Sequence, residues 1–483
     1  MRRGYIRNIE PLKILTDTQV EAIHRATLDV LEETGVRFES QRALRMFKKN
    51  ECIVDFENNR VRFPGYLVEE CIRRTPSSFL VKARDLKNNL RFGGNTLYFM
   101  CSAGARISDP ETGETRVATM KENNEAILIS DALENLDYFP SYTPYFEVEG
   151  VEPVMLCPTS CAMRLRYSSK VSRGAQSADT YIWEIQMAQA CGAQLLGNME
   201  AASPLSYSED AINAGFGYAE AFFPIYIAGG GVMGGTAPVT IAGATISNNA
   251  ELLAAVVFFQ LIKPGVGIIA NDIEYPMNMR SGSPAFGSLG ISLHEAAFNQ
   301  IWTQFYRIPT NNCAAGFPNS KLFDLQSGYE KTHCAMTSAY SGANSILLHG
   351  GVSAELAYNP LMAILDDDLA AIIGRHIEGI VVDSESMAIE LIKEVGPIPG
   401  TYLDKLHTKK HWKRENYVPN CADTLTYPEW ITSGKKSAID YARERMEEIL
   451  ATHEPTPLAA GQDKDIDRIL KEARKYYKDK GML

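Results

Sequence analysis

The sequence predicts an α/β protein built on a (β/α)8 barrel, with an N-terminal helical and β-hairpin cap and C-terminal helices. From Leu136 onward, apolar strand candidates recur about every 25 to 45 residues with helical patterns between them, as in repeated βα units with a parallel sheet. Several of these strands are apolar along nearly their whole length, which is typical of a sheet covered on both faces. Because no dinucleotide-type strand opens the series, we favour a closed barrel over an open, doubly wound sheet.

The strand candidates divide the chain into three parts. We expect a cap at residues 1–120, a barrel catalytic domain at 121–395 and a C-terminal helical extension at 396–483. An eighth, weaker strand candidate is the segment from Gly379 to Val382. The seven clearer strands begin near Leu136, Lys170, Leu195, Phe223, Val266, Ile308 and Ser345.

The two ends of the chain carry helix and turn signals. Thr16 caps a first helix, and a second helix is expected over residues 40–49. The Asn58-Asn59 pair and the turn at residues 111–114 predict two β-hairpins. Two amphipathic helices close the chain, with apolar positions at Ile439, Ala442, Met446 and Ile449 in one and Ile466, Ile469, Leu470 and Ala473 in the other.

Composition and charge argue against nucleic acid or a membrane as a binding partner. Among 483 residues, 48 are basic and 59 acidic, which gives a net charge of −11. Without a long basic run, nucleic acid is not an expected partner. The nine cysteines have no disulfide-like spacing, and we see no secretory leader and no apolar run of the ~20 residues that a membrane span needs. We therefore expect a cytoplasmic protein without a membrane partner.

The stretch from Ile308 to Gly351 is the most informative about function. It reads as strand, loop, helix and strand; the first strand ends in Asn311 and Asn312, and the second ends in His349 before a glycine pair. Polar residues at the carboxyl ends of strands are what an α/β barrel presents at its catalytic face. We therefore expect the functional site at that face.

The same stretch carries a family resemblance. Its segment SKLFDLQSGYEK resembles the signature loop and helix of the trimethylamine methyltransferase superfamily, and the similarity extends over most of the chain, as far as VVDSESMAIELIKEVGPIPGTYL. The founding members carry pyrrolysine in this loop, at or beside the position of Leu322, which here is an ordinary leucine. The chain thus resembles the branch without pyrrolysine, whose characterised members demethylate quaternary amines such as glycine betaine.

This resemblance implies a methyltransferase that moves a methyl group from a quaternary amine, glycine betaine first, to Co(I) of a corrinoid protein and releases dimethylglycine. Cobalamin would belong to that small partner protein, so this chain would hold no tight cofactor and no metal. No residue is expected to act beyond positioning, because a quaternary ammonium departs as a neutral amine without a metal or general acid. A homo-oligomer is also expected. The alternatives are another substrate (proline betaine, carnitine, butyrobetaine or choline) and a non-catalytic betaine-binding protein.

The substrate contacts are predicted from the chemistry of the ligand. A trimethylammonium group is held by aromatic faces, each worth about 2 kcal/mol or more when desolvated, while an anionic tail is held by charged or amide donors. For each aromatic residue the alternative is a core position, and for His349 it is a core histidine with satisfied ring nitrogens. The predicted contacts are Tyr98, Phe99, Tyr142, Arg173, Asn271, Glu274, Asn311, Phe317 and His349.

Two further motifs have competing interpretations. Residues 229–234 match GxGxxG, but no acidic residue follows at the dinucleotide-binding distance, so a structural turn or a small-residue floor for a corrin ring remain. In the second case Gly231, Gly234 and Leu322 would face the corrin. The pair Cys157 and Cys161 invites a zinc interpretation, but without HExxH or a second close cysteine pair these cysteines are expected to be helix-face hydrophobes.

Overall fold

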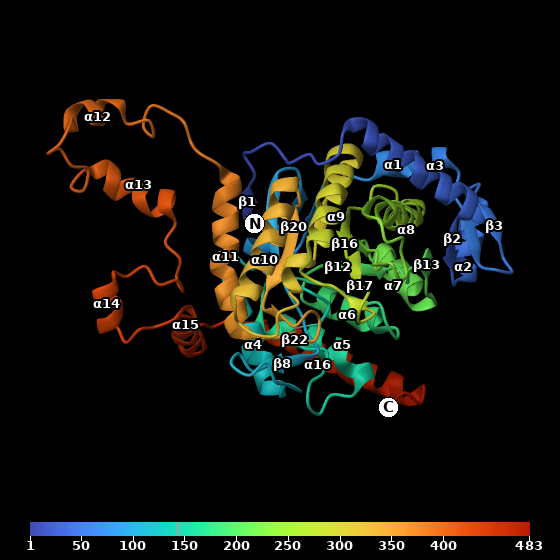
Figure 1. The fold of residues 1–483 in the computed structure, drawn as a ribbon. Helices are drawn as coiled ribbons and strands as arrows, with labels where there is room; N and C mark the ends of the chain where they lie inside the picture. Colours follow the sequence, from blue (N-terminus) through green and yellow to red (C-terminus); the bar gives the residue numbers. More distant parts are fainter. Residues whose placement is uncertain (143) are drawn as a thin grey trace.

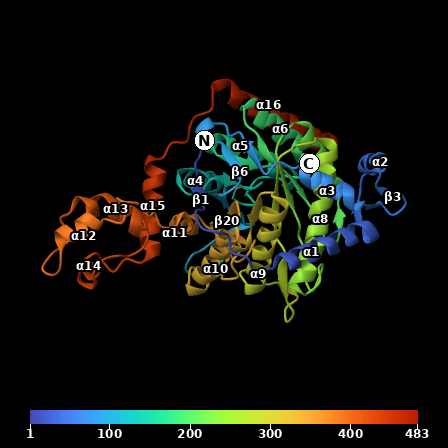
Figure 2. The ribbon, with the colours of Figure 1, turned by 90° about the horizontal axis from the view of Figure 1, so that it is seen from above.

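The structure, a computed structural model that describes residues 1–142 and 144–483, contains a closed barrel of eight parallel strands (Figures 1 and 2). Each strand pairs with its neighbours in chain order, and the last closes on the first through Ser345 beside Tyr98 and Ile346 beside Phe99. The predicted barrel is therefore confirmed. Its strands are β7 (Thr96–Cys101), β10 (Tyr138–Phe139), β11 (Val171–Arg173), β12 (Leu195–Glu200), β14 (Ile225–Ala228), β16 (Ile268–Asp272), β19 (Thr310–Asn312) and β20 (Ser345–His349).

One helix follows each strand and covers the outside of the barrel. Side-chain caps fix where several of them begin: Thr119 and Glu122 form a capping box on α4, Asp324 caps α10, and Asn359 caps α11 just before Pro360. The helices are α4 (Met120–Ala132), α5 (Leu156–Tyr167), α6 (Thr180–Ala190), α7 (Glu209–Glu220), α8 (Ile241–Ile262), α9 (Leu289–Asn299), α10 (Leu325–Ser341) and α11 (Pro360–Glu378).

The eighth barrel strand is not where the sequence predicted it. The segment Gly379–Val382 forms no strand, because the chain leaves the barrel at Gly379, the residue after α11. The missing strand is β7, which comes first and lies within the range 1–120 that was assigned to the cap. Its sequence, TLYFMC, is buried at every position but the first, but it precedes the regular series of strand candidates that begins near Leu136 and was therefore assigned to the cap.

The N-terminal elements match the other predictions. Thr16 caps α1 and Ser40 caps α2, and both hairpins form at the predicted turns. The elements are β1 (Tyr5–Ile6), α1 (Asp17–Asp29), β2 (Val36–Phe38), α2 (Gln41–Lys49), β3 (Ile53–Asp55), β4 (Arg60–Arg62), α3 (Gly65–Arg74), β5 (Ser78–Val81) and β6 (Leu90–Gly93). The short strands in later loops are β8 (Arg106–Ser108), β9 (Thr115–Arg116), β13 (Ser206–Tyr207), β15 (Val232–Met233), β17 (Tyr275–Asn278), β18 (Ser283–Pro284), β21 (Gly351–Val352) and β22 (Ala357–Tyr358).

The β5–β6 hairpin covers the amino-terminal end of the barrel. The ring of Phe92 packs edge-on against Tyr98 and Tyr138, with 5.5 Å between ring centroids in each pair, and Phe79 packs beside Phe92. All four rings are buried in one apolar cluster with the inward residues of the barrel strands. This end of the barrel is thus filled by side chains, which leaves the carboxyl ends of the strands as the open face.

Helix α8 differs from the expectation that the chain has no apolar run long enough to span a membrane. With 22 residues, it is long and apolar enough to cross a membrane, although the sequence was expected to contain no such run. Most of the helix is buried between the barrel and the helices α1, α3, α7 and α9 (Figure 1). Its apolar character therefore matches a core helix, which is hydrophobic on all sides because protein surrounds it.

The C-terminal residues form two packed helices and one projecting segment. Helices α15 and α16 pack on the barrel helices as predicted, with Ala442, Ile449, Ile466 and Ile469 buried. Between α11 and α15, the chain extends away from the barrel (Figures 1 and 2). The helices of this part are α12 (Ile389–Val395), α13 (Leu406–Asn416), α14 (Tyr427–Thr432), α15 (Ala438–Thr452) and α16 (Ala460–Asp479).

Candidate active site

A hydrogen-bonded layer of polar side chains crosses the inside of the barrel. The Tyr138 hydroxyl donates to Asn311 Oδ1 at 3.2 Å and lies 2.8 Å from Ser345 Oγ. The Asn311 amide donates to Asn271 Oδ1 at 2.7 Å and to the Tyr226 hydroxyl at 3.0 Å. These contacts join strands β10, β14, β16, β19 and β20, so the layer has a fixed geometry below the open face.

Cys313 adjoins this layer and donates to Asn271 Oδ1 at 3.1 Å. Burial raises the pKa of the Cys313 thiol to about 12, so the thiol stays protonated near neutral pH and is a poor nucleophile. Asn271 accepts two hydrogen bonds through its oxygen, and its amide nitrogen donates to no residue in the described part of the chain. Asn271 therefore offers a donor to a ligand in the barrel.

Arg173 lies beside this layer. Its guanidinium carbon lies 4.6 Å from the centroid of the Tyr226 ring, its Nε donates to Ser141 Oγ at 3.0 Å, and its Nη1 lies 3.4 Å from Glu200 Oε1. The cation–π contact and the two polar contacts orient the planar guanidinium and leave other N–H donors for a ligand. Because its side chain is only 14% exposed, an anion bound there would be partly desolvated.

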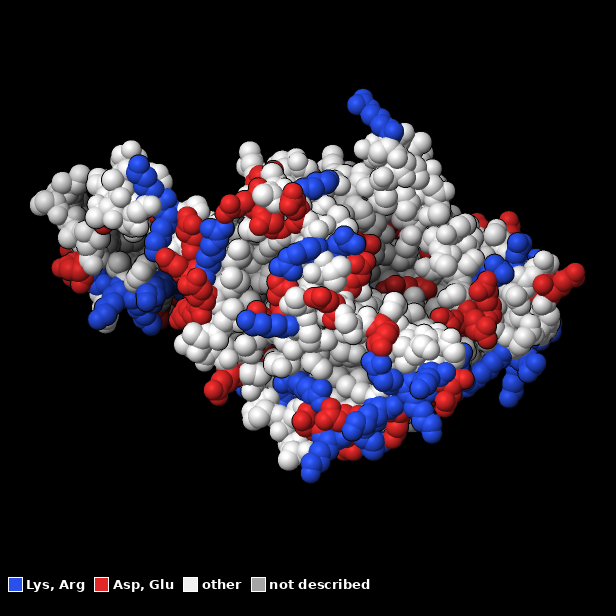
Figure 3. All heavy atoms as spheres, turned by 90° about the horizontal axis from the view of Figure 1, so that it is seen from below, with Lys and Arg blue, Asp and Glu red and all other residues white. Residues whose placement is uncertain are grey.

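Acidic and aromatic residues surround the mouth above Arg173. The Glu355 side chain is accessible to solvent at the open face, but neighbouring atoms partly desolvate its carboxyl group. This desolvation and then the negative charge of Glu200 raise the pKa of Glu355, whereas the charge of Arg173 lowers it. Tyr275, Phe286 and Phe317 form an aromatic cluster with ring centroids 4.3 to 6.4 Å apart. Figure 3 views this face and shows acidic side chains inside a central hollow.

Tyr142 belongs to the same end of the barrel. Its ring packs edge-on against Phe146, with 4.5 Å between centroids, and burial followed by the nearby Cys157 raises its pKa. The negative charge of Glu200 adds to this upward shift in the pKa of Tyr142. The phenol therefore stays neutral and presents an aromatic surface.

A second buried cluster lies beside the mouth, between the loops after β14 and β16. His294 Nδ1 lies 2.6 Å from Asp272 Oδ2; burial disfavours the imidazolium, but the charge of Asp272 outweighs it and raises the pKa of His294. Burial raises the pKa of Glu274 to about 8. Both Glu274 oxygens and His294 Nε2 lack hydrogen-bond partners among the described residues. A Cβ on Gly231 would lie 2.3 Å from the Glu274 oxygens, so this carboxyl group occupies the space beside that glycine.

The structure brings some of the predicted contacts together and separates others. Arg173, Asn271 and Asn311 meet inside the barrel, Tyr142 and Phe317 lie at its mouth, and Glu274 lies beside them. The structure places the other three predicted substrate contacts away from this site: Tyr98, Phe99 and His349.

Each separation has a physical reason. Tyr98 lies at the start of β7, at the closed end, where its hydroxyl donates to Arg2 O at 3.3 Å. Phe99 faces outward, with its ring 6.2 Å from that of Tyr5. His349 also faces outward, with Nε2 3.4 Å from Asp367 Oδ1 on α11, because the strand register shifts between Leu347 and His349.

The residues predicted to face a corrin also differ in accessibility. Gly231 is buried under Glu274, whereas Gly234 is exposed in a turn with φ +93°, a conformation that favours glycine. Leu322 is 38% exposed and lies beside the β8–β9 hairpin, where a Cβ on Gly113 would be 3.2 Å from its Cδ2. Of the three, Gly234 and Leu322 are accessible to a protein that approaches the mouth.

Several site residues were absent from the sequence-based set: Tyr138, Tyr226, Glu200, Cys313, Tyr275, Phe286 and Glu355. Strand alternation could have found Tyr226, because Tyr226 and Ala228 both belong to the barrel-interior cluster while Ile225 and Ile227 belong to the outer one. Glu200, at the carboxyl end of β12, follows the same logic as Asn271. Glu355 lies in the turn between β21 and β22, and nothing in its local sequence signals proximity to Arg173.

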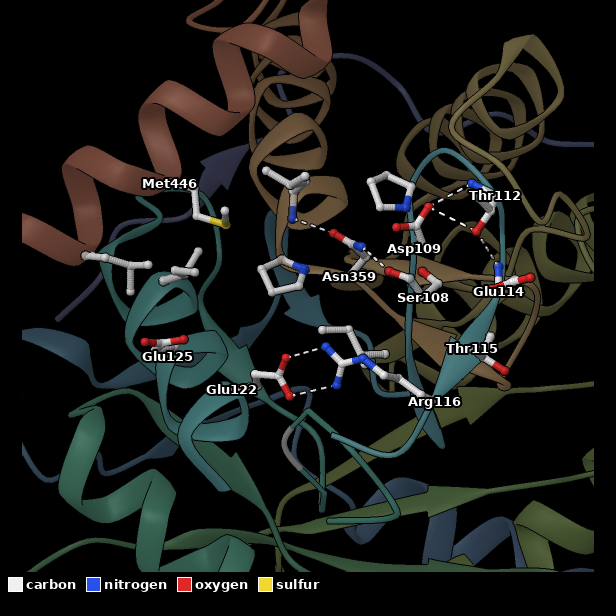
Figure 4. A pocket seen from close by; sticks show the side chains of 16 residues that line it. Ser108, Asp109, Thr112, Glu114, Thr115, Arg116, Glu122, Glu125, Asn359 and Met446 are labelled. Atoms are coloured by element: carbon white, nitrogen blue, oxygen red, sulfur yellow. Dashed lines mark hydrogen bonds and ion pairs between the residues drawn. The ribbon is translucent and has the colours of Figure 1, made fainter. Parts of the chain in front are cut away.

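A separate pocket of about 580 Å³ lies outside the barrel, between the β8–β9 hairpin and helices α4, α11 and α15 (Figure 4). Arg116 forms a two-point ion pair with Glu122, at 2.9 and 2.5 Å, and Asp109 accepts from Thr112. Asn359 donates to the Ser108 carbonyl at 2.7 Å. Because these groups bond to one another, we do not include this pocket in the candidate active site.

Comparison with known proteins identifies the family. The chain matches the family model for trimethylamine methyltransferase (MTTB) over residues 2–476. The chain belongs to this family. Among curated MTTB-family relatives, a glycine betaine methyltransferase from Desulfitobacterium hafniense is 30% identical over 94% of this chain and 95% of its own length. A trimethylamine methyltransferase MttB from Methanosarcina barkeri is 27% identical over 97% and 96%. These relatives are methyltransferases.

Solved structures support the fold. The monomethylamine methyltransferase MtmB of Methanosarcina barkeri is 15% identical to this MTTB-family chain, with a TM-score of 0.51, and the match covers 96% of this chain and 93% of MtmB. The hydroxylamine complex of MtmB gives the same TM-score at 14% identity. Within residues 1–142 and 144–483, no group of three or more His, Cys, Asp and Glu side chains is arranged to hold a metal ion.

Proposed function

We propose that this protein removes a methyl group from a quaternary amine, most specifically glycine betaine, and transfers it to the reduced cobalt of a separate corrinoid protein, releasing dimethylglycine. The observation that carries the proposal is the Arg173 guanidinium, stacked on Tyr226, beside Glu200 and below an aromatic mouth. Inside a barrel of the MTTB family, this arrangement matches a small ligand with one anionic and one cationic end.

The charge pattern fits a zwitterion better than a simple cation. A ligand carboxylate beside Arg173 and the Asn271 amide would gain charge-assisted hydrogen bonds. A trimethylammonium group has no N–H donor, so it would be stabilised by the negative charge of Glu200 and Glu355 and by aromatic faces such as those of Tyr142 and Phe317. The deep part of the barrel is thus complementary to the carboxylate and the mouth to the cation, which would present an N-methyl group outward.

The protonation states agree with this chemistry. Methyl transfer from a quaternary ammonium releases a neutral tertiary amine, so no side chain has to deliver a proton to the leaving nitrogen. The Cys313 thiol and the Tyr138 and Tyr226 phenols stay neutral, because burial raises the pKa of each. These groups position the ligand without competing as methyl acceptors. An aliphatic Leu322 in the signature loop is consistent with a substrate that leaves unaided.

The methyl acceptor would approach the open face. When bound there, the reduced cobalt of the corrinoid protein supplies the nucleophile that takes the methyl group. The residues of this chain would hold the amine in line with that approach and exclude water from it. The loops at the carboxyl ends of the strands present a rim of exposed apolar side chains suited to a docking protein. They are Val239, Met279, Leu289, Leu322, Leu325 and Leu356.

The test is a substrate panel with Co(I) cobalamin, free or on a corrinoid protein, in which the visible absorbance of the cobalt reports methylation. We expect glycine betaine to be demethylated, and we expect trimethylamine to be inert, because a tertiary amine would leave as an unfavourable anion unless it were activated. Proline betaine, carnitine, butyrobetaine and choline complete the panel. Equal rates with trimethylamine and glycine betaine, or binding of betaine without any demethylation, would contradict the proposal.

A further inference from the structure

Two buried charged side chains lie on α5 and α6, the helices before and after the strand that ends in Arg173. Arg164 on α5 and Glu184 on α6 are 2% and 0% exposed, and Arg164 Nη2 lies 3.7 Å from Glu184 Oε1. This distance is longer than a hydrogen bond. Each side chain makes its hydrogen bonds with other groups instead, and those groups indicate its role.

Arg164 holds the backbone that follows two neighbouring barrel strands. Its Nη1 donates to the carbonyl oxygen of Ser141, in the loop after β10, and to Ser160 Oγ at 3.1 Å. Its Nη2 donates to the carbonyl oxygen of Arg173, the last residue of β11, at 3.4 Å. Because a guanidinium presents its N–H donors in a fixed planar geometry, this one side chain holds both segments in a defined relation to each other.

Glu184 holds the loop that follows Arg173. Its Oε2 accepts from the Ala175 N–H at 2.7 Å, and Tyr218 Oη lies 2.8 Å from both that oxygen and the Ala175 carbonyl oxygen. A Cβ on Gly174 would lie 2.1 Å from Tyr218 Oη, so the phenol can take this position because residue 174 is glycine. The backbone around Arg173 is thus fixed by side chains of α5, α6 and α7.

Ser141 connects this fixed backbone to the side chain of Arg173. Its Oγ donates to the Gly174 carbonyl oxygen and accepts from Arg173 Nε at 3.0 Å. Ser141 is 1% exposed, so both hydrogen bonds are shielded from water. The hydroxyl is placed by the backbone that Arg164 and Glu184 hold, and it in turn orients the guanidinium of Arg173.

Burying two charges at this position is unfavourable for the fold. The desolvation of a buried ion pair often exceeds the attraction between its members, and apolar residues of similar volume are often at least as stabilising. Burial raises the pKa of Glu184 to about 7 while the charge of Arg164 lowers it, so the carboxyl group is largely ionised at about pH 8. Stability alone does not account for this pair, whereas its contacts with the backbone around Arg173 do.

We infer that Arg164 and Glu184 are positioning residues, which orient the Arg173 guanidinium through the backbone of both loops and the Ser141 hydroxyl. The inference rests on the proposed role of Arg173 in binding the substrate carboxylate. Neither Arg164 nor Glu184 would touch the substrate, because both are buried on the outer helices. A guanidinium held in one orientation before the ligand arrives loses less conformational freedom on binding, which increases affinity for the anionic end of the substrate alone.

The first experiment measures, by calorimetry at about pH 8, the Kd of glycine betaine and of tetramethylammonium for wild-type protein and E184Q. This substitution keeps the volume of the side chain and removes its charge. We expect the Kd for glycine betaine to rise about three- to tenfold and the Kd for tetramethylammonium to change less than about twofold. The matched control D368N changes a buried carboxylate on α11 that accepts from the Cys421 N–H at 2.6 Å, and it should leave both affinities unchanged.

A double variant shows whether Glu184 acts through Arg173. In R173K/E184Q the guanidinium that Glu184 orients is already absent, so glycine betaine should bind at most about twofold more weakly than to R173K alone. Wild-type affinity of E184Q for glycine betaine, equal weakening of the two ligands, or independent effects that multiply in the double variant would each overturn the inference. R164K, which cannot hold both loops, takes the place of E184Q in this cycle if E184Q does not fold.

A measurement without ligand separates this inference from the proposed function. In isotope-labelled protein, nuclear magnetic resonance detects the Arg173 Nε–H as a signal that is absent from R173K. Its hydrogen exchange with solvent should be at least about tenfold faster in E184Q and R164K than in wild type, approaching the rate in S141A, which removes the acceptor of this N–H. Wild-type exchange in both variants would overturn the inference. If R173K binds glycine betaine as tightly as wild type, the proposed carboxylate site is wrong, and the exchange rates still decide whether Arg164 and Glu184 orient Arg173.

Discussion

Replacing Arg173 by lysine tests the proposal that this residue binds the carboxylate of the substrate. Lysine keeps the positive charge but lacks the planar fork that stacks on Tyr226 and contacts Ser141 and Glu200. The substitution therefore removes the planar, oriented set of N–H donors and leaves the net charge of the site unchanged. We expect R173K to fold normally and to bind glycine betaine more weakly.

The size of the effect follows from the contacts. Losing one charge-assisted hydrogen bond to a partly desolvated carboxylate costs about 1.5 to 3 kcal/mol. Because each 1.4 kcal/mol is about a tenfold change in affinity, the Kd for glycine betaine should rise about 10- to 100-fold. Tetramethylammonium has no carboxylate, so its Kd should change less than about twofold if Arg173 acts on the anionic end alone.

Calorimetric titration of glycine betaine and tetramethylammonium into wild-type protein and R173K measures the Kd of each ligand and needs no corrinoid partner. The matched control is R166K, at an arginine that pairs with Asp463 and Asp467 on α16, outside the barrel. R166K should leave both affinities unchanged. Equal weakening of the two ligands by R173K, or no weakening of glycine betaine, would refute the assignment of the carboxylate to Arg173.

Three further outcomes are expected. Burial and the charge of Glu200 raise the pKa of Glu355, so the affinity for glycine betaine should fall as the pH is lowered through that pKa. The variant E355Q should bind glycine betaine several-fold more weakly at about pH 8 and show a flatter profile of Kd against pH. An unchanged slope would argue against Glu355 facing the cation. Burial raises the pKa of Glu274 to about 8, above its unfolded value, so its stabilising contribution is present below the unfolded pKa and is lost as pH rises through 8. In chemical denaturation, E274Q should therefore lose about 1 to 2 kcal/mol less stability than wild type between about pH 6.5 and 8.5, and parallel losses would contradict the buried position. A Cβ on Gly351 would lie 1.8 Å from the Gly316 carbonyl oxygen, so G351A should lower stability by about 3 kcal/mol or more, whereas its control G328A, with nothing within 4 Å, should leave the thermal midpoint unchanged or raise it.

The barrel could be predicted from the sequence because its strands are buried on both faces and separated by well-capped helices. The exception was β7. It lies within the range assigned to the cap, and the strand before it, β6, pairs with β5 through contacts such as Phe79 with Phe92. Which strand opens the barrel depends on pairing between Ser345 and Tyr98, residues that are far apart in the chain, and local patterns carry no such information.

The site was only partly predictable for a related reason. The end of a strand can be read from sequence, and Arg173, Asn271 and Asn311, which end strands, lie near one another in the structure. Their role as substrate contacts stays a prediction. The side on which a residue projects depends on uninterrupted alternation, and the register shift before His349 turns that ring toward α11. Strand direction places Tyr98 at the closed end of the barrel, away from the site. By contrast, Tyr138 and Tyr226, which lie in short apolar runs of the sequence, belong to the polar layer of the site.

The rings packed under Tyr98 and Tyr138 have a kinetic consequence. Because aromatic side chains fill the amino-terminal end of the barrel, the described residues leave the carboxyl-terminal end open, and the proposed amine and methyl acceptor would share that end. In the proposed reaction the amine would therefore have to enter before the acceptor docks, and the demethylated product would leave only after the acceptor has departed. Steady-state turnover would then follow a compulsory order, in which an excess of acceptor protein slows the reaction by occupying the empty enzyme.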